Sequence, residues 1–166
     1  IEPSRGLGDV YKRQVVEADE SDGSFNNLPA TIAVVTNIDP EHLDFHGSFE
    51  NLKNAFRSFV KNIPFYGFAV VCLDHPVVQE LVQQIPDRRI ITYGFDKESD
   101  VQATKITATE SGSCFDVIVR DRGKTNSGSI ERLELPMYGE HNVLNSLAAI
   151  ALSLIHISEP TRRLNI

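Results

Sequence analysis

Residues 68–73 read Phe-Ala-Val-Val-Cys-Leu, and this short apolar run decides the fold that the sequence predicts. An uninterrupted apolar run with β-branched residues at its centre is typical of a strand buried on both faces. Residues 49–63 before it and 76–85 after it carry apolar side chains at helical spacing. Apolar runs at Thr31–Val35 and Arg89–Phe95 complete the alternation of strands and helices. This alternation predicts an α/β fold with a partial doubly wound, mostly parallel sheet and helices on both faces.

Capping residues and prolines give the predicted helix boundaries. Ser48 can cap the first helix, and Pro64 stops it. Asp74 is predicted to cap the second helix, with Pro76 in its first turn and Pro86 after its end. Each helix therefore has a start signal and a stop signal of its own.

The second half of the chain changes to a period of two. Residues alternate between apolar and polar in three segments, which are Val101–Thr109, Cys114–Asp121 and Ile130–Met137. Such alternation is typical of half-exposed antiparallel strands, and the polar residues 122–129 are expected to join the last two as a hairpin. A final helix is predicted from His141 to about Leu152, after Gly139. The sequence thus predicts a small antiparallel β subregion beside the parallel sheet.

The two ends differ from the middle of the chain. Residues 1–14 show no clear period, and in residues 153–166 Pro160 interrupts the helical pattern before a basic tail. Both ends resemble translated sequencing-adaptor read-through and are expected to be a non-native or disordered leader and tail. Residues 15–152 are left as one predicted domain, and 166 residues are enough for one hydrophobic core.

Composition excludes several classes of partner. The net charge of -7 and pI near 5.2 argue against a nucleic-acid groove or an anionic membrane surface. A phosphate ligand stays possible because a metal ion and backbone N–H groups can supply positive potential. Cys72 and Cys114 are too few for a zinc ribbon or disulfide framework, so we expect reduced thiols and a cytoplasmic protein. The longest apolar run, residues 147–157, is too short to span a bilayer.

Two acidic segments carry the predicted chemistry. Thr36–Asp44 reads Thr-Asn-Ile-Asp-Pro-Glu-His-Leu-Asp and follows the strand Thr31–Val35, while Glu17–Asp22 follows a predicted short strand, Val15–Val16. Ligands of open α/β sheets bind at the carboxyl ends of strands. Two such ends with carboxylates and one imidazole predict a site for magnesium and phosphate.

Other candidate motifs fail on their context. Gly123-Lys124-Thr125 lacks the upstream glycine of a phosphate-binding loop and sits in the predicted hairpin loop, so it is interpreted as a polar turn. His46, His75 and His156 show no partner pattern, and no role is predicted for them. The aromatic residues of the helix 49–63 are predicted to be core.

Five segments in order resemble the central ATPase domain of the Mur ligases over roughly residues 15–152. They are Glu17–Phe25, Thr36–Asp44, Asn62–Gly67, Thr92–Phe95 and Gly139–Ala149. The sequences Asp-Glu-Ser-Asp-Gly-Ser-Phe and Asn-Ile-Pro-Phe-Tyr-Gly look like the members of this family that add L-alanine. The nearest alternative within the family is the ligase that recycles murein tripeptide.

The resemblance implies an ATP-dependent ligase of peptidoglycan precursor synthesis that acts on UDP-N-acetylmuramate and L-alanine through an acyl phosphate. It implies that Glu17 and His42 bind Mg²⁺ beside the reacting carboxylate. It also implies that His141, Asn142 and Asn145 lie against the adenine and ribose of ATP. The triphosphate-binding loop of the family is not found in the sequence, so this polypeptide alone is expected to be inactive.

Alternatives remain for individual residues and for the whole chain. Asn142 is as consistent with a helix N-cap as with a ligand contact. Asp19, Glu20 and Asp22 are expected to be mostly a solvated acidic loop, with one of them capping the next turn.

A stand-alone metal hydrolase and a non-catalytic nucleotide-binding module are the alternatives from other classes. The hydrolase would use carboxylates and an imidazole around a metal-bound water, from Glu17, Asp39, His42 and Asp44. The nucleotide-binding module would keep only the adenosine contacts of residues 141–145.

Overall fold

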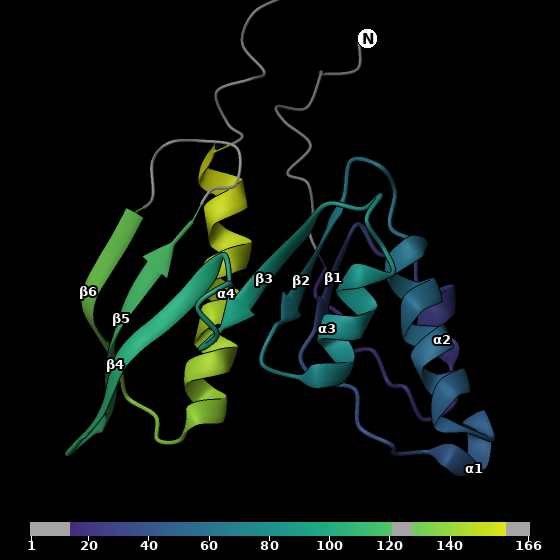
Figure 1. The fold of residues 1–166 in the computed structure, drawn as a ribbon, viewed down its shortest axis with the longest axis horizontal. Helices are drawn as coiled ribbons and strands as arrows, with labels where there is room; N and C mark the ends of the chain where they lie inside the picture. The colour runs from purple at the N-terminus through teal and green to yellow at the C-terminus, as the bar shows by residue number, and fades with distance from the viewer. Residues whose placement is uncertain (1–13, 121–127, 159–166) are drawn as a thin grey trace, which may run out of the picture.

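The computed structural model describes residues 14–120 and 128–158, which form one six-stranded sheet with helices on both faces (Figure 1). Strand order follows chain order from β1 to β6. The strands are β1 (Ile32–Val35), β2 (Phe68–Cys72), β3 (Ile90–Gly94), β4 (Val101–Thr109), β5 (Gly112–Val119) and β6 (Gly128–Leu135). Pairings from β1 to β4 are parallel and those from β4 to β6 are antiparallel. The predicted mixed α/β architecture is thereby confirmed.

Strand β2 lies at the centre of the packing because all of its residues are buried. Successive side chains of a strand point to opposite faces. Accordingly, Ala69 and Val71 join the core on one face, and Phe68, Val70 and Cys72 join the core on the other. An apolar strand without polar alternation is therefore what a sheet covered on both faces requires.

Helices α2 (Phe49–Lys61) and α3 (Pro76–Gln83) cover one face of the parallel strands, and α4 (Glu140–Ser158) covers the other (Figure 1). The Ser48 side chain caps α2 by accepting a hydrogen bond from the Asn51 N–H at 3.2 Å, as predicted. Two short elements, η1 (Ser24–Asn27) and α1 (Leu43–His46), lie before and after β1 in the chain. None of the helices within the described ranges is long and apolar enough to cross a membrane.

The structure corrects two local predictions. Val15–Val16 is not a strand and pairs with none of the strands in the described part of the chain, and the Val15 side chain is 99% exposed. Residue 75, not Asp74, occupies the N-cap of α3. The Asp74 carboxylate instead accepts hydrogen bonds from the backbone N–H groups of Phe95 and Asp96 at 2.7 and 2.9 Å. A carboxylate between two loops can satisfy either one, and here the loop after β3 is the one it binds.

Helix α4 runs to Ser158, beyond the predicted end near Leu152. Residues 121–127, which include most of the predicted hairpin loop 122–129 and its Gly123-Lys124-Thr125, lie outside the described residues, as do 1–13 and 159–166. The free thiols of Cys72 and Cys114 are buried and half-buried, respectively.

Candidate functional site

The carboxyl end of β1 carries the candidate site, since the two acidic segments of the sequence meet there. Residues 36–42 leave β1 and lead into α1, and the loop 17–22 leads into η1. A hydrogen bond from a side chain to the backbone joins the two segments: Nε2 of His46, in α1, donates to the carbonyl oxygen of Glu20 at 2.7 Å. This hydrogen bond places the Glu20 side chain beside the loop after β1.

Glu20, Glu41 and His42 bring their ligand atoms together at this end of the sheet. One carboxylate oxygen of each glutamate and one ring nitrogen of His42 all lie within 4.8 Å of one another. His42 Nε2 is 3.6 Å from Glu20 Oε1. The backbone of His42 is left-handed, with φ of 52°, a conformation uncommon for a residue with a side chain. Such conformations cluster at functional sites, and here it directs the imidazole toward Glu20.

One pair of ligand atoms in this cluster lies close enough to share a divalent cation. Mg²⁺ binds oxygen ligands at about 2.1 Å, so two ligands on opposite sides of the ion are about 4.2 Å apart. The 3.6 Å between His42 Nε2 and Glu20 Oε1 falls within that limit. Two carboxylates supply the hard, negatively charged ligands that Mg²⁺ prefers, and an imidazole widens the choice to Mn²⁺.

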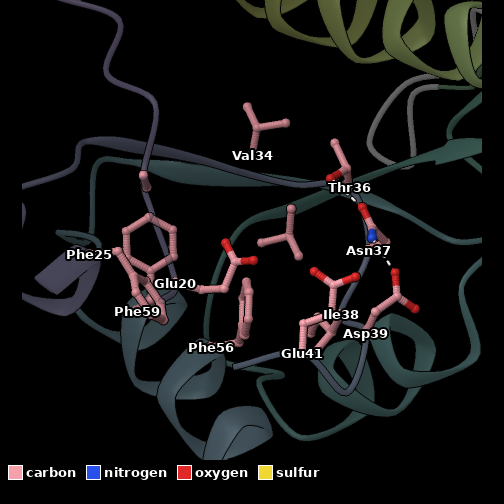
Figure 2. A pocket seen from close by; sticks show the side chains of 12 residues that line it. Glu20, Phe25, Val34, Thr36, Asn37, Ile38, Asp39, Glu41, Phe56 and Phe59 are labelled. Carbon is pink, nitrogen blue, oxygen red and sulfur yellow. Dashed lines mark hydrogen bonds between the residues drawn. The ribbon is translucent and has the colours of Figure 1, made fainter. Parts of the chain in front are cut away.

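A hollow of about 160 Å³ opens between the acidic loop and the end of β1 (Figure 2). Its polar rim holds Glu20 and Glu41. Its floor is formed by the aromatic rings of Phe25, Phe56 and Phe59. The ring centroid of Phe25 lies 5.2 Å from that of Phe56 and 5.3 Å from that of Phe59. The aromatic residues of α2 are part of the core, as predicted, and they also form the base of this hollow.

Hydrogen bonds within the acidic loop stabilise the ionised form of two of its carboxylates. The backbone and side chain of Ser21 hold the pKa of Asp19 below its usual value. The side chain and backbone of Ser24 lower the pKa of Asp22 in the same way. Asp22 Oδ1 accepts a hydrogen bond from the Ser24 N–H at 2.9 Å at the start of η1, although Gly23 occupies the N-cap position. The acidic loop beside the cluster therefore carries negative charge, which suits a cation rather than a free phosphate.

The structure brings only part of the predicted metal site together. His42 belongs to the cluster. Glu17 is exposed in a segment that is neither helix nor strand and is not a member of the cluster. Of the carboxylates considered for a hydrolase, Asp39 and Asp44 are also not members. Glu20 and Glu41 are the carboxylates that the structure groups with His42, and a metal role for Glu17 stays a prediction.

The sequence alone does not distinguish Glu20 and Glu41 from the carboxylates around them. Glu41 directly precedes His42, and Glu20 lies in the quoted acidic segment. Several carboxylates of similar spacing occur in each segment, so only the left-handed turn at His42 and the contact from His46 distinguish these two. His46 and His75 were predicted to have no role, yet each contacts one of the two segments.

The predicted nucleotide-contacting residues lie at the start of α4, at the same end of the sheet as α1 (Figure 1). His141 and Asn145 are exposed, and Asn142 is half-buried. Asn142 is not the N-cap, because α4 begins at Glu140. Its side-chain Nδ2 donates to the carbonyl oxygen of Tyr138 at 2.7 Å, and its side-chain oxygen takes no part in that bond. The exposed pair at 141 and 145 is free to face a ligand.

Known proteins resemble this chain over most of its length. Residues 10–153 match the family model of the Mur ligase middle domain. The chain is similar to the UDP-N-acetylmuramate–L-alanine ligase of Rhodospirillum rubrum, with 56% identity over 139 residues that make up 84% of this chain and 29% of that ligase. It is 60% identical to the ligase of the same name from Methylocella silvestris over 148 residues, 89% of this chain and 31% of that protein. The chain thus spans under a third of the length of these two relatives.

A solved structure shares the fold. It is the UDP-N-acetylmuramate:L-alanyl-gamma-D-glutamyl-meso-diaminopimelate ligase of Neisseria meningitides, with a TM-score of 0.66 and 23% identity. The match covers 83% of this chain and 41% of that one.

Proposed function

The chain belongs to the Mur ligase family through its middle domain, and from this premise we propose that it is part of an ATP-dependent ligase that joins L-alanine to UDP-N-acetylmuramate. The observation that carries the proposal is the identity of 56% and 60% to two relatives that bear this name. The cluster of Glu20, Glu41 and His42 supports it, because a ligase that uses ATP needs a cation site at the sheet end. The proposed substrates are small molecules, and the proposed compartment is the cytoplasm.

The proposed reaction takes place in the whole protein. The γ-phosphoryl group of ATP is transferred to the carboxylate of UDP-N-acetylmuramate, which gives an acyl phosphate and ADP. The amine of L-alanine attacks the acyl carbon, and the tetrahedral intermediate expels phosphate and leaves an amide. Both partners of the first step are anions, so their repulsion must be offset before they can approach.

The residues of this chain would meet that demand in two places. Glu20, Glu41 and His42 would hold Mg²⁺, and Glu17 stays a proposed fourth ligand from the exposed segment before them. When bound, the ion supplies positive charge between the carboxylate and the triphosphate. His141, Asn142 and Asn145 would orient the adenosine from the start of α4, where the amide of Asn142 is already fixed by Tyr138.

Cation binding by this chain tests the site directly. We expect Mn²⁺, followed by electron paramagnetic resonance, to bind the wild-type chain and to bind Glu41→Gln and His42→Gln more than about tenfold more weakly. Asp44→Asn is the matched control, because Asp44 is an exposed carboxylate outside the cluster. Glu17→Gln decides whether residue 17 is a ligand. Equal binding by Glu41→Gln, His42→Gln and the wild type would refute the cluster.

Activity tests the reaction. A protein extended to the length of the relatives is expected to release phosphate only when ATP, UDP-N-acetylmuramate and L-alanine are all present. Turnover with murein tripeptide but not L-alanine would favour the recycling ligase, and hydrolysis without ATP would favour a metal hydrolase. The 166-residue chain alone is expected to release none. Phosphate release by that chain would contradict this expectation.

A further inference from the structure

His75 lies next to the candidate cation site without belonging to it. It occupies the N-cap of α3, directly after β2, while the loop that carries Glu41 and His42 follows β1, the neighbouring strand. His75 Nε2 is 3.3 Å from Asp39 Oδ1. The two residues are 36 positions apart in the chain, so this contact fastens the loop after β1 to the start of α3.

Asp39 also forms hydrogen bonds within the loop 36–42, so it connects His75 to that loop. Its other carboxylate oxygen, Oδ2, accepts a hydrogen bond from Asn37 Nδ2, and Thr36 donates in turn to Asn37 Oδ1 at 2.8 Å (Figure 2). The backbone carbonyl of Asp39 accepts from the Glu41 N–H at 2.7 Å. Both carboxylate oxygens of Asp39 therefore have a partner, and its backbone carbonyl is hydrogen-bonded to the cluster member Glu41.

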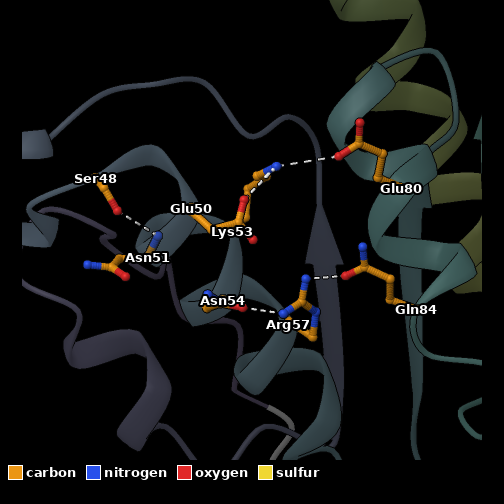
Figure 3. A network of polar contacts seen from close by, with 8 residues as sticks. All are labelled: Ser48, Glu50, Asn51, Lys53, Asn54, Arg57, Glu80 and Gln84. Atoms are coloured by element: carbon orange, nitrogen blue, oxygen red, sulfur yellow. Dashed lines mark hydrogen bonds and ion pairs between the residues drawn. The ribbon is translucent and has the colours of Figure 1, made fainter.

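Helix α3, from which His75 reaches, is itself held firmly. Lys53 of α2 pairs with Glu80 of α3 at 3.5 Å, and Arg57 of α2 donates to Gln84 at the end of α3 (Figure 3). Val78 and Leu81 of α3 are buried in the core beneath. The imidazole of His75 thus extends from the well-packed helix α3 toward an exposed loop.

The surroundings of the ring select one tautomer. Nδ1 of His75 is buried and has no hydrogen-bond partner among the described residues. A proton on Nδ1 would be a buried donor without an acceptor, and Nε2 would then face the Asp39 carboxylate with no proton to donate. The proton of the neutral ring therefore belongs on Nε2, where the Asp39 carboxylate accepts it.

From this geometry we propose that His75 is a positioning residue, which orders the loop 36–42 through Asp39 so that Glu41 and His42 are held in the arrangement that binds a cation. The inference rests on the proposed cation site and goes beyond it, because His75 touches none of the three cluster residues in the contacts described. The partners behind metal ligands fix the orientation of those ligands, and their loss typically weakens metal binding by about tenfold or more.

Two substitutions that differ by one methylene separate this role from a general effect on α3. In His75→Gln the amide nitrogen stands as many bonds from Cβ as Nε2 does in histidine, so it can still donate to Asp39. In His75→Asn the amide is too short for that contact, but asparagine is among the best N-cap residues, and histidine makes no side-chain cap bond here. A purely structural role at the helix start would therefore favour asparagine over glutamine.

The experiment measures Mn²⁺ affinity of the 166-residue chain by electron paramagnetic resonance. We expect His75→Asn to raise the Kd about tenfold, and His75→Gln to stay within about twofold of wild type. Nitrogen-15 spectra of the wild-type imidazole should show the proton on Nε2, and Asp39→Ala should shift that signal.

Wild-type Mn²⁺ binding with equal affinities of the two variants, or with the weaker affinity in His75→Gln, would overturn this inference alone. Absence of Mn²⁺ binding by the wild type would overturn the proposed cation site and this inference with it.

Discussion

The backbone at Gly67 leaves no room for a side chain. A Cβ atom there would lie 2.1 Å from the carbonyl oxygen of Thr31 and 2.5 Å from Ile63 Cγ2. Gly67→Ala must therefore displace the start of β2 from β1, and we expect a loss of about 1–3 kcal/mol in the free energy of unfolding, measured with urea. Gly128→Ala is the matched control, because nothing lies within 4 Å of a Cβ there. Equal stability of the two variants would contradict this close approach.

Tyr93 makes the stability of the chain depend on alkaline pH. Burial raises the pKa of its phenol well above the usual value, so the folded state keeps the proton that the unfolded state releases above about pH 10. A raised pKa in the folded state means that stability is complete below the unfolded pKa and falls as pH rises beyond it. The expected contribution is about 1.4 kcal/mol per pH unit.

Tyr93→Phe removes this contribution, so its free energy of unfolding should fall less between pH 10 and pH 11 than that of the wild type. Urea titrations at the two pH values measure the difference. Tyr66→Phe, at an exposed tyrosine, should leave the wild-type pH dependence unchanged. A Tyr93→Phe variant with the wild-type slope would show that the phenol titrates in the folded state.

Some residues of the candidate site could be predicted from the sequence, and others could not. His42 was predicted through its motif, and the structure places it in the cluster. The sequence could not show which carboxylates lie beside His42, because side chains one or two positions apart differ in direction only once the backbone turns are known. The contacts of His46 and His75 join segments 26 and 36 positions apart, and no local pattern encodes such a pair.

Helix α2 begins where the sequence provides a capping group, Ser48. Its side chain satisfies the Asn51 N–H in the first turn of α2. Ser48→Ala should lower the free energy of unfolding by about 1 kcal/mol, measured by urea titration of the circular dichroism signal. Ser58→Ala, at an exposed position inside the same helix, should have no cost, since alanine is the better helix former. Equal losses at both positions would refute the cap.

Strands and helices with a strong period were predictable, and those that depend on a partner were not. The helix 49–63 and the strand 68–73 were predicted from apolar spacing and end signals, and the structure confirms both. Val15–Val16 has the composition of a strand, yet a strand exists only through hydrogen bonds to a neighbour. Asp74 had two possible partners, and only the folded position of residues 95 and 96 decides between them.

The whole molecule consists of two cores separated by one sheet. The first lies under α2 and α3, and the second lies between α4 and strands β2 to β6. The two are not independent, because alternate residues of β2 belong to one and to the other. A disturbance of either core displaces β2, so we infer that the two layers unfold together.

Leu52 of α2 and Leu147 of α4 test this coupling from opposite faces. Each is fully buried, so Leu52→Ala and Leu147→Ala should each cost about 2–5 kcal/mol. We expect a single urea transition in both variants, with the protection of amides in α2 and α4 against hydrogen exchange reduced equally. Leu43→Ala, at an exposed leucine, should change little. If Leu147→Ala left the α2 amides as protected as in the wild type, the two layers would unfold as separate units. Equal loss of protection in both helices would mean that β2 couples the layers, because its side chains enter both cores.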